Sequence, residues 1–174
     1  LVLRGGTRAS GTGNRPSVAQ HPLCSIGAAV VDVGVSVPAV PHRGGDLALT
    51  QQSVTAGGCA LNVALALHRL GMVSVNALPV GQGVWASVIR QKLEQYGLTT
   101  AIEIPAGDNG WSLAMVESDG ERTFMSVAGV GNLWTPETLA ALSVAEDSWI
   151  YLSGYQLISG AGETLLHWLE QRQI

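Results

Sequence analysis

The stretch from Thr55 to Gly71 constrains the fold of this chain more than any other part of the sequence. It reads TAGGCALNVALALHRLG, so two adjacent glycines precede a long apolar segment. Apolar residues recur in that segment with a period of about 3.6 residues, which predicts an α-helix with one face packed on a sheet. The glycine at position 71 is typical of a left-handed helix end. A strand end, a glycine turn and a helix in this order indicate an α/β fold.

Asn62 lies off the apolar stripe, one turn into the predicted helix. It follows Gly57 and Gly58, which leave the backbone uncovered, so a ligand could approach there and meet the polar side chain. Glycine pairs are also common at buried strand-to-helix corners, where an asparagine makes only a local hydrogen bond. The glycine pair alone leaves both interpretations open.

The spacing of small residues around Asn62 resembles the N-terminal signature of the ribokinase-like (PfkB) carbohydrate kinases. The matching positions are Gly57, Gly58, Ala60, Asn62, Ala64, Gly71 and Gly81. The resemblance implies a three-layer α/β/α fold with a small β-sheet lid, and sugar contacts at Gly57, Gly58 and Asn62. It also implies ATP-dependent phosphoryl transfer to a hydroxymethyl group of a sugar or nucleoside, with ATP and Mg²⁺ as cofactors.

Residues 23–37 (LCSIGAAVVDVGVSV) form an apolar, β-branched run that predicts a buried first strand. Asp32 lies inside this run, where a carboxylate costs free energy unless it is paired or bound to something. From the residues alone, a strand-end hydrogen bond and a ligand contact are even alternatives. The spacing from Ile26 and Gly27 to Asp32 resembles the first strand of the family, whose aspartate accepts hydrogen bonds from sugar hydroxyls. The resemblance therefore implies that Asp32 binds substrate.

Two further segments predict strands, and the resemblance implies that these strands build a small sheet outside the main domain. Residues 46–55 partly alternate apolar and polar residues, and residues 110–126 predict a hairpin that turns at Asp119-Gly120. They resemble the lid strands of the family, here near 44–56 and 110–127, in which a small residue at Ser112 or Ala114 touches the sugar. A lone hairpin is marginally stable, so the 46–55 strand or a second subunit is expected to cover it. The resemblance also makes a homodimer through the lid sheet plausible.

The rest of the chain alternates between expected strands and helices. Strands are predicted at 73–80 and 149–154, and helices at 87–96, 135–142 and 162–173. This alternation predicts a parallel sheet covered by helices. Gly154, at the end of the last strand, matches the substrate-facing edge of the family. One loop departs from the pattern at Gln82-Gly83. The chain reads Gly81-Gln82-Gly83 where family members usually have Gly-Asp-Asp or Gly-x-Asp, so the substrate-side role of this loop stays unassigned.

Composition excludes several classes of function. The chain has 174 residues, 47% of them hydrophobic, which is enough for one domain with a sizeable core. A net charge of −4 does not indicate the excess of basic residues that binding to nucleic acid or to an anionic membrane surface requires. No apolar run reaches the roughly 18 residues of a membrane span, and no signal peptide is recognisable. Cys24 and Cys59 suffice for neither a disulfide framework nor a metal site, and are expected to be buried thiols in a reducing cytoplasm.

The first 22 residues are polar and rich in Gly, Arg and Ser, without any period. They are expected to be a disordered leader or vector-derived sequence. Residues 23–174 are expected to form the N-terminal, substrate-binding half of a ribokinase-like domain, with the C-terminal half absent from this chain.

Phosphoryl transfer needs positioned nucleotide phosphates, usually Mg²⁺, and a group that accepts the proton of the attacking hydroxyl. The sequence has no Walker-type glycine loop with lysine. In the family these parts lie in the second half, so the resemblance places the catalytic residues after Ile174 and no metal site within the chain. Two hypotheses remain: the sugar-binding half and lid of a kinase, or a non-catalytic sugar-binding or interaction protein derived from a truncated kinase.

Overall fold

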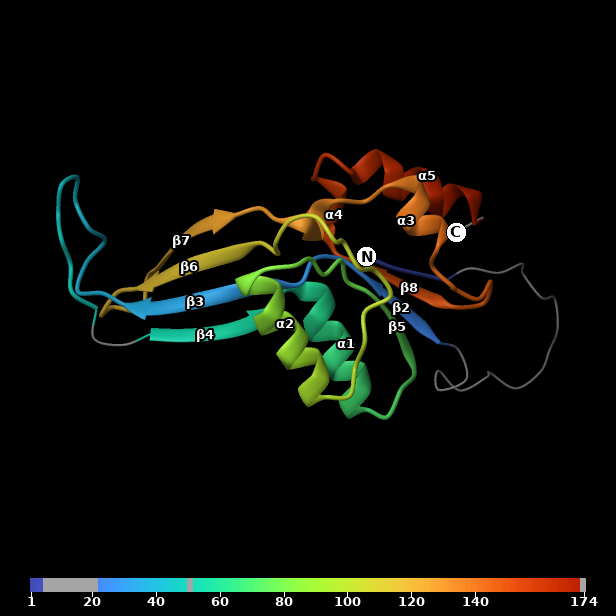
Figure 1. The fold of residues 1–174 in the computed structure, drawn as a ribbon, viewed down its shortest axis with the longest axis horizontal. Coiled ribbons are helices and arrows are strands. Elements are labelled where there is room, and N and C mark those ends of the chain that lie inside the picture. The colour runs from blue at the N-terminus through green and yellow to red at the C-terminus, as the bar shows by residue number, and fades with distance from the viewer. Residues whose placement is uncertain (5–21, 50–51, 173–174) are drawn as a thin grey trace.

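Two four-stranded sheets follow one another along the long axis of the molecule (Figure 1). The computed structural model describes residues 1–4, 22–49 and 52–172. Helices lie on both sides of one sheet, which we call the main sheet, and the other projects away from them and is called the lid sheet. This arrangement is the α/β fold with a small lid that the sequence predicts.

The main sheet has the strand order β1-β8-β2-β5. Its members are β1 (Val2–Arg4), β2 (Leu23–Ile26), β5 (Ser74–Ala77) and β8 (Trp149–Leu152). The strands β8, β2 and β5 run parallel, as the alternation of strands and helices predicts, whereas β1 is antiparallel to β8. Their carboxyl ends therefore meet at one edge of the sheet, the edge from which the chain passes to the lid sheet.

Helices cover both faces of the main sheet and make the α/β/α layers (Figure 1). On one side lie α1 (Cys59–Arg69) and α2 (Val84–Gln95); on the other lie α3 (Pro136–Ala140), α4 (Gly154–Leu157) and α5 (Gly162–Gln171). A short 3-10 helix, η2 (Val130–Asn132), precedes α3. Two clusters of buried apolar side chains result: one includes Leu61 and Ile89 of α1 and α2, and the other includes Cys24 and Leu165.

The lid sheet has the order β4-β3-β6-β7. Its strands are β3 (Val30–Ser36), β4 (Gln52–Gly57), β6 (Trp111–Val116) and β7 (Arg122–Val127). The hairpin β6–β7 forms where it is predicted, but its partner is β3, which runs parallel to β6. The expectation that the 46–55 strand covers the hairpin is therefore wrong, because β4 pairs with the opposite edge of β3.

The apolar run 23–37 is divided between the two sheets instead of forming one strand. It forms β2 in the main sheet and β3 in the lid sheet, with a break at residues 27–29. At the break the chain passes between α1 and the end of β8, since a Cβ on Gly27 would lie 2.8 Å from that of Ala60 and 3.0 Å from that of Ser153. A run of β-forming residues does not reveal that its two halves pair with different partners.

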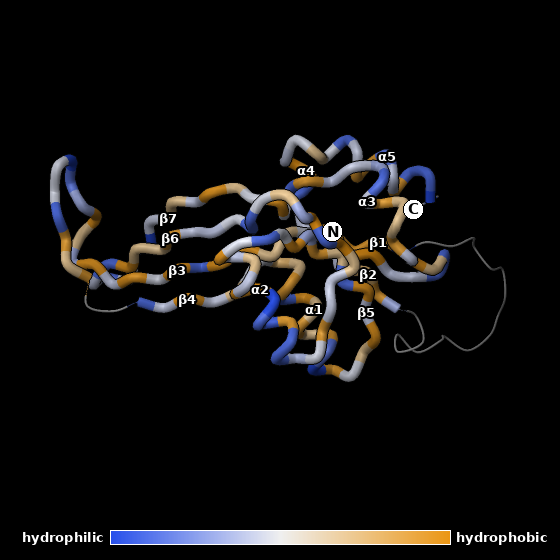
Figure 2. Tube along the Cα trace, viewed as in Figure 1, coloured by the Kyte–Doolittle hydropathy of each residue, from blue (hydrophilic) through white to orange (hydrophobic). Residues whose placement is uncertain are grey.

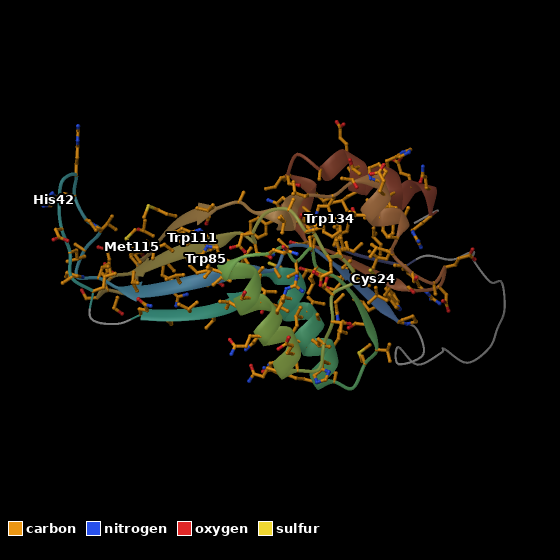
Figure 3. The ribbon with its side chains drawn as sticks, viewed as in Figure 1. Cys24, His42, Trp85, Trp111, Met115 and Trp134 are labelled. Atoms are coloured by element: carbon orange, nitrogen blue, oxygen red, sulfur yellow. The ribbon has the colours of Figure 1, made fainter. Side chains whose placement is uncertain are left out.

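The strands of the lid sheet alternate between an apolar face and a polar face. One row of in-register partners is Val54, Val33, Leu113 and Met125, and the next row on the other face is Thr55, Asp32, Ser112 and Ser126. Figure 2 shows the resulting mixture of hydrophobic and hydrophilic residues along these strands. At the base of the apolar face, Trp85 of α2 stacks on Trp111 with ring centroids 5.2 Å apart. Figure 3 labels the two residues next to each other. α2 therefore packs against strands of the lid sheet.

The first residues of the chain take part in the main sheet. Val2–Arg4 pairs with β8, and the ammonium group of Leu1 donates to the carbonyl oxygen of Leu152 at 3.0 Å. This differs from the expectation of a structureless leader over residues 1–22, because β8 offers a free edge that a short apolar segment can extend. Residues 5–21 of that leader lie outside the described residues.

Candidate functional site

Asp32 and Gly57 meet where the lid sheet joins the main sheet. They lie on adjacent antiparallel strands, with Thr55 opposite Asp32 and Gly57 opposite Val30. A Cβ on Gly57 would lie 2.5 Å from Oδ2 of Asp32, so the carboxylate occupies the space of the missing side chain. Burial raises the pKa of the Asp32 carboxyl, and no hydrogen-bond donor or cation of the described residues offsets this effect. The site thus holds a partly buried acceptor that has no hydrogen-bond partner among the described residues.

Gly58 continues this corner and precedes α1. Its φ of +105° is one that residues with a side chain rarely adopt, and a Cβ there would lie 2.5 Å from the carbonyl oxygen of Ala28. Among the described residues, no side chain caps the first turn of α1. The first amide groups of this helix are therefore available to an acceptor beside Gly58.

The side chain of Asn62 is exposed one turn into α1, as its position off the apolar stripe predicts. Its backbone amide donates to the carbonyl oxygen of Gly58 at 2.9 Å, so Asn62 lies one helical turn after the glycine pair.

The two cysteines differ in exposure. Cys59, in the first turn of α1, is exposed, contrary to the expectation that both cysteines are buried. Cys24 is buried as expected, and burial raises the pKa of its thiol to about 12.

Ser112 lies directly opposite Asp32 across the parallel pair β3–β6, and Ala114 lies opposite Gly34. The Ser112 hydroxyl is 3.0 Å from that of Ser126 on β7. The structure therefore brings Asp32 and Ser112 side by side on the polar face of the lid sheet, next to Gly57. Ala114 is one step further out on the same face.

Gly154 stands at the same carboxyl edge of the main sheet, at the start of α4. The amide of the preceding Ser153 donates to the carbonyl oxygen of Ile26 at 3.1 Å, which ties this turn to the end of β2. A Cβ on Gly154 would meet nothing within 4 Å. The fold of the described residues thus gives no steric reason for a glycine at this position.

A carboxylate does stand at the start of α2, although it does not come from the Gln82-Gly83 loop. Asp108 accepts hydrogen bonds from the backbone amides of Trp85 at 3.1 Å and Ala86 at 2.7 Å. Its side chain also fills the space beside Gly83, where a Cβ would clash with the carboxylate. A residue from the loop before β6 therefore supplies the carboxylate at the start of α2.

Asn109 is a second residue that the sequence reasoning missed. Its side chain is buried and hydrogen bonds to three backbone groups, at Ala29, Pro79 and Gly81. The only local signal is the Asp-Asn-Gly sequence before the hairpin, which also occurs in ordinary turns.

A buried glutamine organises the other side of this edge. Gln156 of α4 accepts from Nε1 of Trp134 at 2.7 Å and donates to Oδ1 of Asn132 at 3.2 Å. Trp134 lies beside the helices α3 to α5 in Figure 3. Asn132 is thereby fixed at the end of η2, close to the turn that begins at Gly154.

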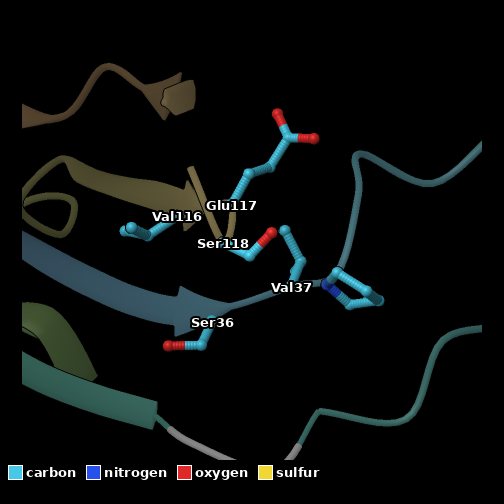
Figure 4. Close-up of a pocket in the computed structure, with 6 residues that line it drawn as sticks. Ser36, Val37, Val116, Glu117 and Ser118 are labelled. Atoms are coloured by element: carbon cyan, nitrogen blue, oxygen red, sulfur yellow. The ribbon is translucent and has the colours of Figure 1, made fainter. Parts of the chain in front are cut away.

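Two hollows lie on the lid sheet, further from the main sheet than Asp32. The larger, of about 280 Å³, is lined by Ser36, Val37, Pro38, Val116, Glu117 and Ser118 at the outer ends of β3 and β6 (Figure 4). The smaller, of about 120 Å³, is lined by Gly34, Val35, Ser36, Ser53 and Val116. Neither of these two hollows is lined by Asp32, Gly57 or Asn62.

Within the described ranges, no three His, Cys, Asp or Glu side chains come close enough together to hold a metal ion. None of the helices in that part of the chain combines the length and the apolar character needed to cross a membrane.

The sequence profile described as pfkB family carbohydrate kinase matches residues 20–173. The chain is also 57% identical over 148 residues to a protein of Escherichia coli (strain K12) named uncharacterized sugar kinase YegV. That match covers 85% of this chain and 46% of the relative, so the chain spans about half the length of that protein.

Solved structures show the same fold. A ribokinase of Arabidopsis thaliana, solved in complex with ribose and ATP, has a TM-score of 0.61 and 21% identity, covering 70% of this chain and 42% of that one. A ribokinase of Giardia lamblia has a TM-score of 0.62 and 18% identity, covering 70% and 40%. A nucleoside kinase of Methanocaldococcus jannaschii has a TM-score of 0.57 and 14% identity, covering 74% and 42%. Since the profile match extends over most of the chain, and the two-sheet architecture agrees with these ribokinase-like structures, the protein belongs to the pfkB family of carbohydrate kinases.

Proposed function

We propose that this chain supplies the sugar-binding corner and the lid of an ATP-dependent kinase, which phosphorylates a hydroxymethyl group of a sugar or nucleoside. One observation carries the proposal: the Asp32 carboxylate lies against Gly57, at the base of the lid sheet, beside the uncapped start of α1. A carboxylate accepts up to four hydrogen bonds and donates none, which suits the donor-rich surface of a sugar.

Each residue of the corner has a role in this proposal. Asp32 accepts hydrogen bonds from two ring hydroxyls, and Asn62 reaches a third from α1. Gly57 makes room for the Asp32 carboxylate and Gly58 for the close approach of Ala28, so the glycine pair shapes the corner at which the first amides of α1 donate to the ring oxygens. Hydrogen bonds to the ionised carboxylate favour its charged form, so they oppose the rise in pKa that burial causes at Asp32.

The lid sheet closes the site from one side. Ser112 and Ala114 are small, so the polar face of the lid can come close to the sugar. Closure excludes water, which protects the transferred phosphoryl group from hydrolysis. Gly154 marks the opposite side of the same corner, at the turn fixed to β2.

ATP supplies the phosphoryl group in this proposal, and Mg²⁺ would neutralise its phosphate charge. The described residues contain no cluster of acidic or histidine side chains that fits a metal ion. We assign the nucleotide site and the catalytic base to the part of family members that follows the equivalent of Ile174. The ribokinase from Arabidopsis thaliana, solved with ribose and ATP, supports the pairing of these ligands on this fold.

The proposal includes a homodimer through the apolar face of the lid sheet. Met125 and Val127 on the edge strand β7 are 55% and 51% exposed, and Val54 on the other edge strand is 42% exposed. A second copy of the same face would cover these residues and the in-register row between them.

The net charge of the chain is −4, so neither nucleic acid nor a membrane is a proposed partner. The proposed compartment is the cytoplasm, where ATP is made.

The test is an ATP-consumption screen of the full-length protein over sugars and nucleosides, followed by Asp32→Ala. We expect Asp32→Ala to weaken sugar affinity by about tenfold or more while ATP affinity changes little. The exposed Asp46, on the loop between β3 and β4, provides a control as Asp46→Ala. Sugar binding measured by calorimetry without any turnover would favour the rival, a non-catalytic sugar-binding protein. Equal loss of sugar and ATP affinity would contradict the role of Asp32.

A further inference from the structure

We propose that Asn109 is a positioning residue that locks the lid sheet to the main sheet and thereby sets Asp32 and Ser112 against the glycine pair. Its effect on the substrate rests on the proposed function, whereas its mechanical role rests on contacts in the structure. Asn109 is 3% exposed and precedes β6, so it stands at the base of the lid sheet.

The side chain of Asn109 reaches three segments of backbone that are distant in sequence. Its Nδ2 donates to the carbonyl oxygens of Ala29 at 3.2 Å and Pro79 at 2.9 Å, and its Oδ1 accepts from the amide of Gly81 at 2.9 Å. Ala29 leads directly into β3 of the lid sheet, while Pro79 and Gly81 follow β5 of the main sheet. One amide group therefore joins the two sheets.

Asparagine is the residue type that satisfies all three partners. Two donors and one acceptor in a plane match two carbonyl groups and one amide, and the length of the side chain sets their spacing. Aspartate would place a carboxylate against two carbonyl oxygens, and alanine would leave all three backbone groups unpaired in a buried place.

The contacts of Asn109 act on both strands that carry the sugar-binding residues. Ala29 is three residues before Asp32, and Asn109 is three residues before Ser112. The next contact outward is the hydrogen bond from the amide of Val31 to the carbonyl oxygen of Gly110, at 3.1 Å. Any shift at Asn109 therefore moves Asp32 and Ser112 together, relative to the glycine pair before α1.

The backbone segments around Asn109 are packed so closely that they leave little room for the chain to shift. A Cβ on Gly110 would lie 2.7 Å from the carbonyl oxygen of Val127, and one on Gly131 would lie 2.7 Å from the Cβ of Ala28. The stacked rings of Trp85 and Trp111 lie at the same base of the lid sheet (Figure 3). Because all four lid strands enter through this tight region, a lost hydrogen bond cannot be replaced by local rearrangement.

Asn76 provides a matched control for the loss of a buried asparagine. It is 5% exposed, donates to the carbonyl oxygen of Thr99 at 3.1 Å and accepts from the hydroxyl of Ser74 at 2.9 Å. It lies on β5 in the main sheet, and its side-chain partners belong to β5 and the loop after α2. Asn76→Ala therefore costs stability without loosening the lid sheet.

The experiment compares the full-length wild type with Asn109→Ala, Asn109→Asp and Asn76→Ala by hydrogen exchange and by sugar kinetics. For Asn109→Ala we expect exchange in β3 and β6 to accelerate about tenfold more than in β8 and α5, and the KM for sugar to rise about tenfold. Asn76→Ala should lower the unfolding temperature without either effect. Asn109→Asp should match Asn109→Ala at neutral pH and recover partly as the pH falls, because a protonated carboxyl regains one donor.

Two results would overturn the proposal. One is exchange in Asn109→Ala that accelerates evenly over the chain, as global destabilisation predicts. The other is an unchanged KM for sugar despite faster exchange in the lid strands. If the wild type phosphorylates no sugar or nucleoside, the proposed function fails, while the exchange data still decide whether Asn109 holds the lid sheet.

Discussion

The carboxylate of Asp32 fills the space beside Gly57 so closely that a Cβ there would lie 2.5 Å from Oδ2. The two residues come from neighbouring strands, β3 and β4, at the end of the lid sheet that meets the main sheet. The position of the carboxylate thus depends on the absence of a side chain at position 57. This dependence gives a physical reason why the glycine at position 57 and a distant aspartate meet at one corner of the fold.

Gly57→Ala tests this dependence. We expect the new methyl group to displace the Asp32 carboxylate, lowering the free energy of unfolding by about 1 to 3 kcal/mol and raising the KM for sugar at least about tenfold. Denaturant unfolding and steady-state kinetics measure the two effects. The control is Gly160→Ala, since a Cβ on Gly160 meets nothing within 4 Å. Unchanged sugar kinetics in Gly57→Ala would show that Asp32 does not hold the substrate.

The raised pKa of Asp32 predicts a pH dependence of stability. Because burial raises the folded-state pKa above the unfolded one, the folded state holds the proton over the interval between them. Stability therefore falls as the pH rises through this interval and stays constant above it. Asp32→Asn should remove that fall, so the variant should be the more stable protein at neutral pH while losing sugar affinity. Thermal unfolding across the acidic range checks this, and an unchanged pH profile in Asp32→Asn would contradict it.

The elements that the sequence predicts well are those whose signal is local. The periodicity of α1 and of α5 lies within the helices, and the glycine pair marks the turn before α1 wherever the rest of the chain goes. Even there the limits of a local signal are visible. Leu70 continues the apolar stripe of α1, yet it caps the helix and is 74% exposed.

The features that the sequence does not predict depend on distant partners. The run 23–37 looks like one strand because each residue in it favours a strand, and only pairing with β5 and β6 separates its halves. Asn109 has no recognisable pattern because one of its partners, Ala29, lies 80 residues away. The sequence does not reveal that Asp108 caps α2, because the two are brought together only in the fold. The carboxylate fits there because Gly83 has no side chain.

Asp108 should contribute to stability through the start of α2. Its two carboxylate oxygens accept from the amides of Trp85 and Ala86, and a negative charge there also suits the helix dipole. We expect Asp108→Ala to lower the free energy of unfolding by about 1 kcal/mol, and Asp108→Asn by less, because asparagine keeps one acceptor. Denaturant unfolding of the three proteins measures this order. Equal stability of Asp108→Ala and the wild type would mean that water caps the helix as well as the carboxylate does.

The proposed homodimer makes Met125→Lys the most direct change to its interface. Met125 ends an in-register apolar row that crosses all four lid strands, and it is 55% exposed in the single chain. If a second copy covers this row, a lysine there buries an unpaired charge, so we expect the dissociation constant of the dimer to rise about a hundredfold or more. Light scattering after size exclusion, over a range of protein concentrations, measures the change. Leu70→Lys is the control, because Leu70 is 74% exposed at the end of α1, away from the lid sheet. A wild type that stays monomeric at every concentration, or equal dissociation in both variants, would rule out the lid sheet as the interface.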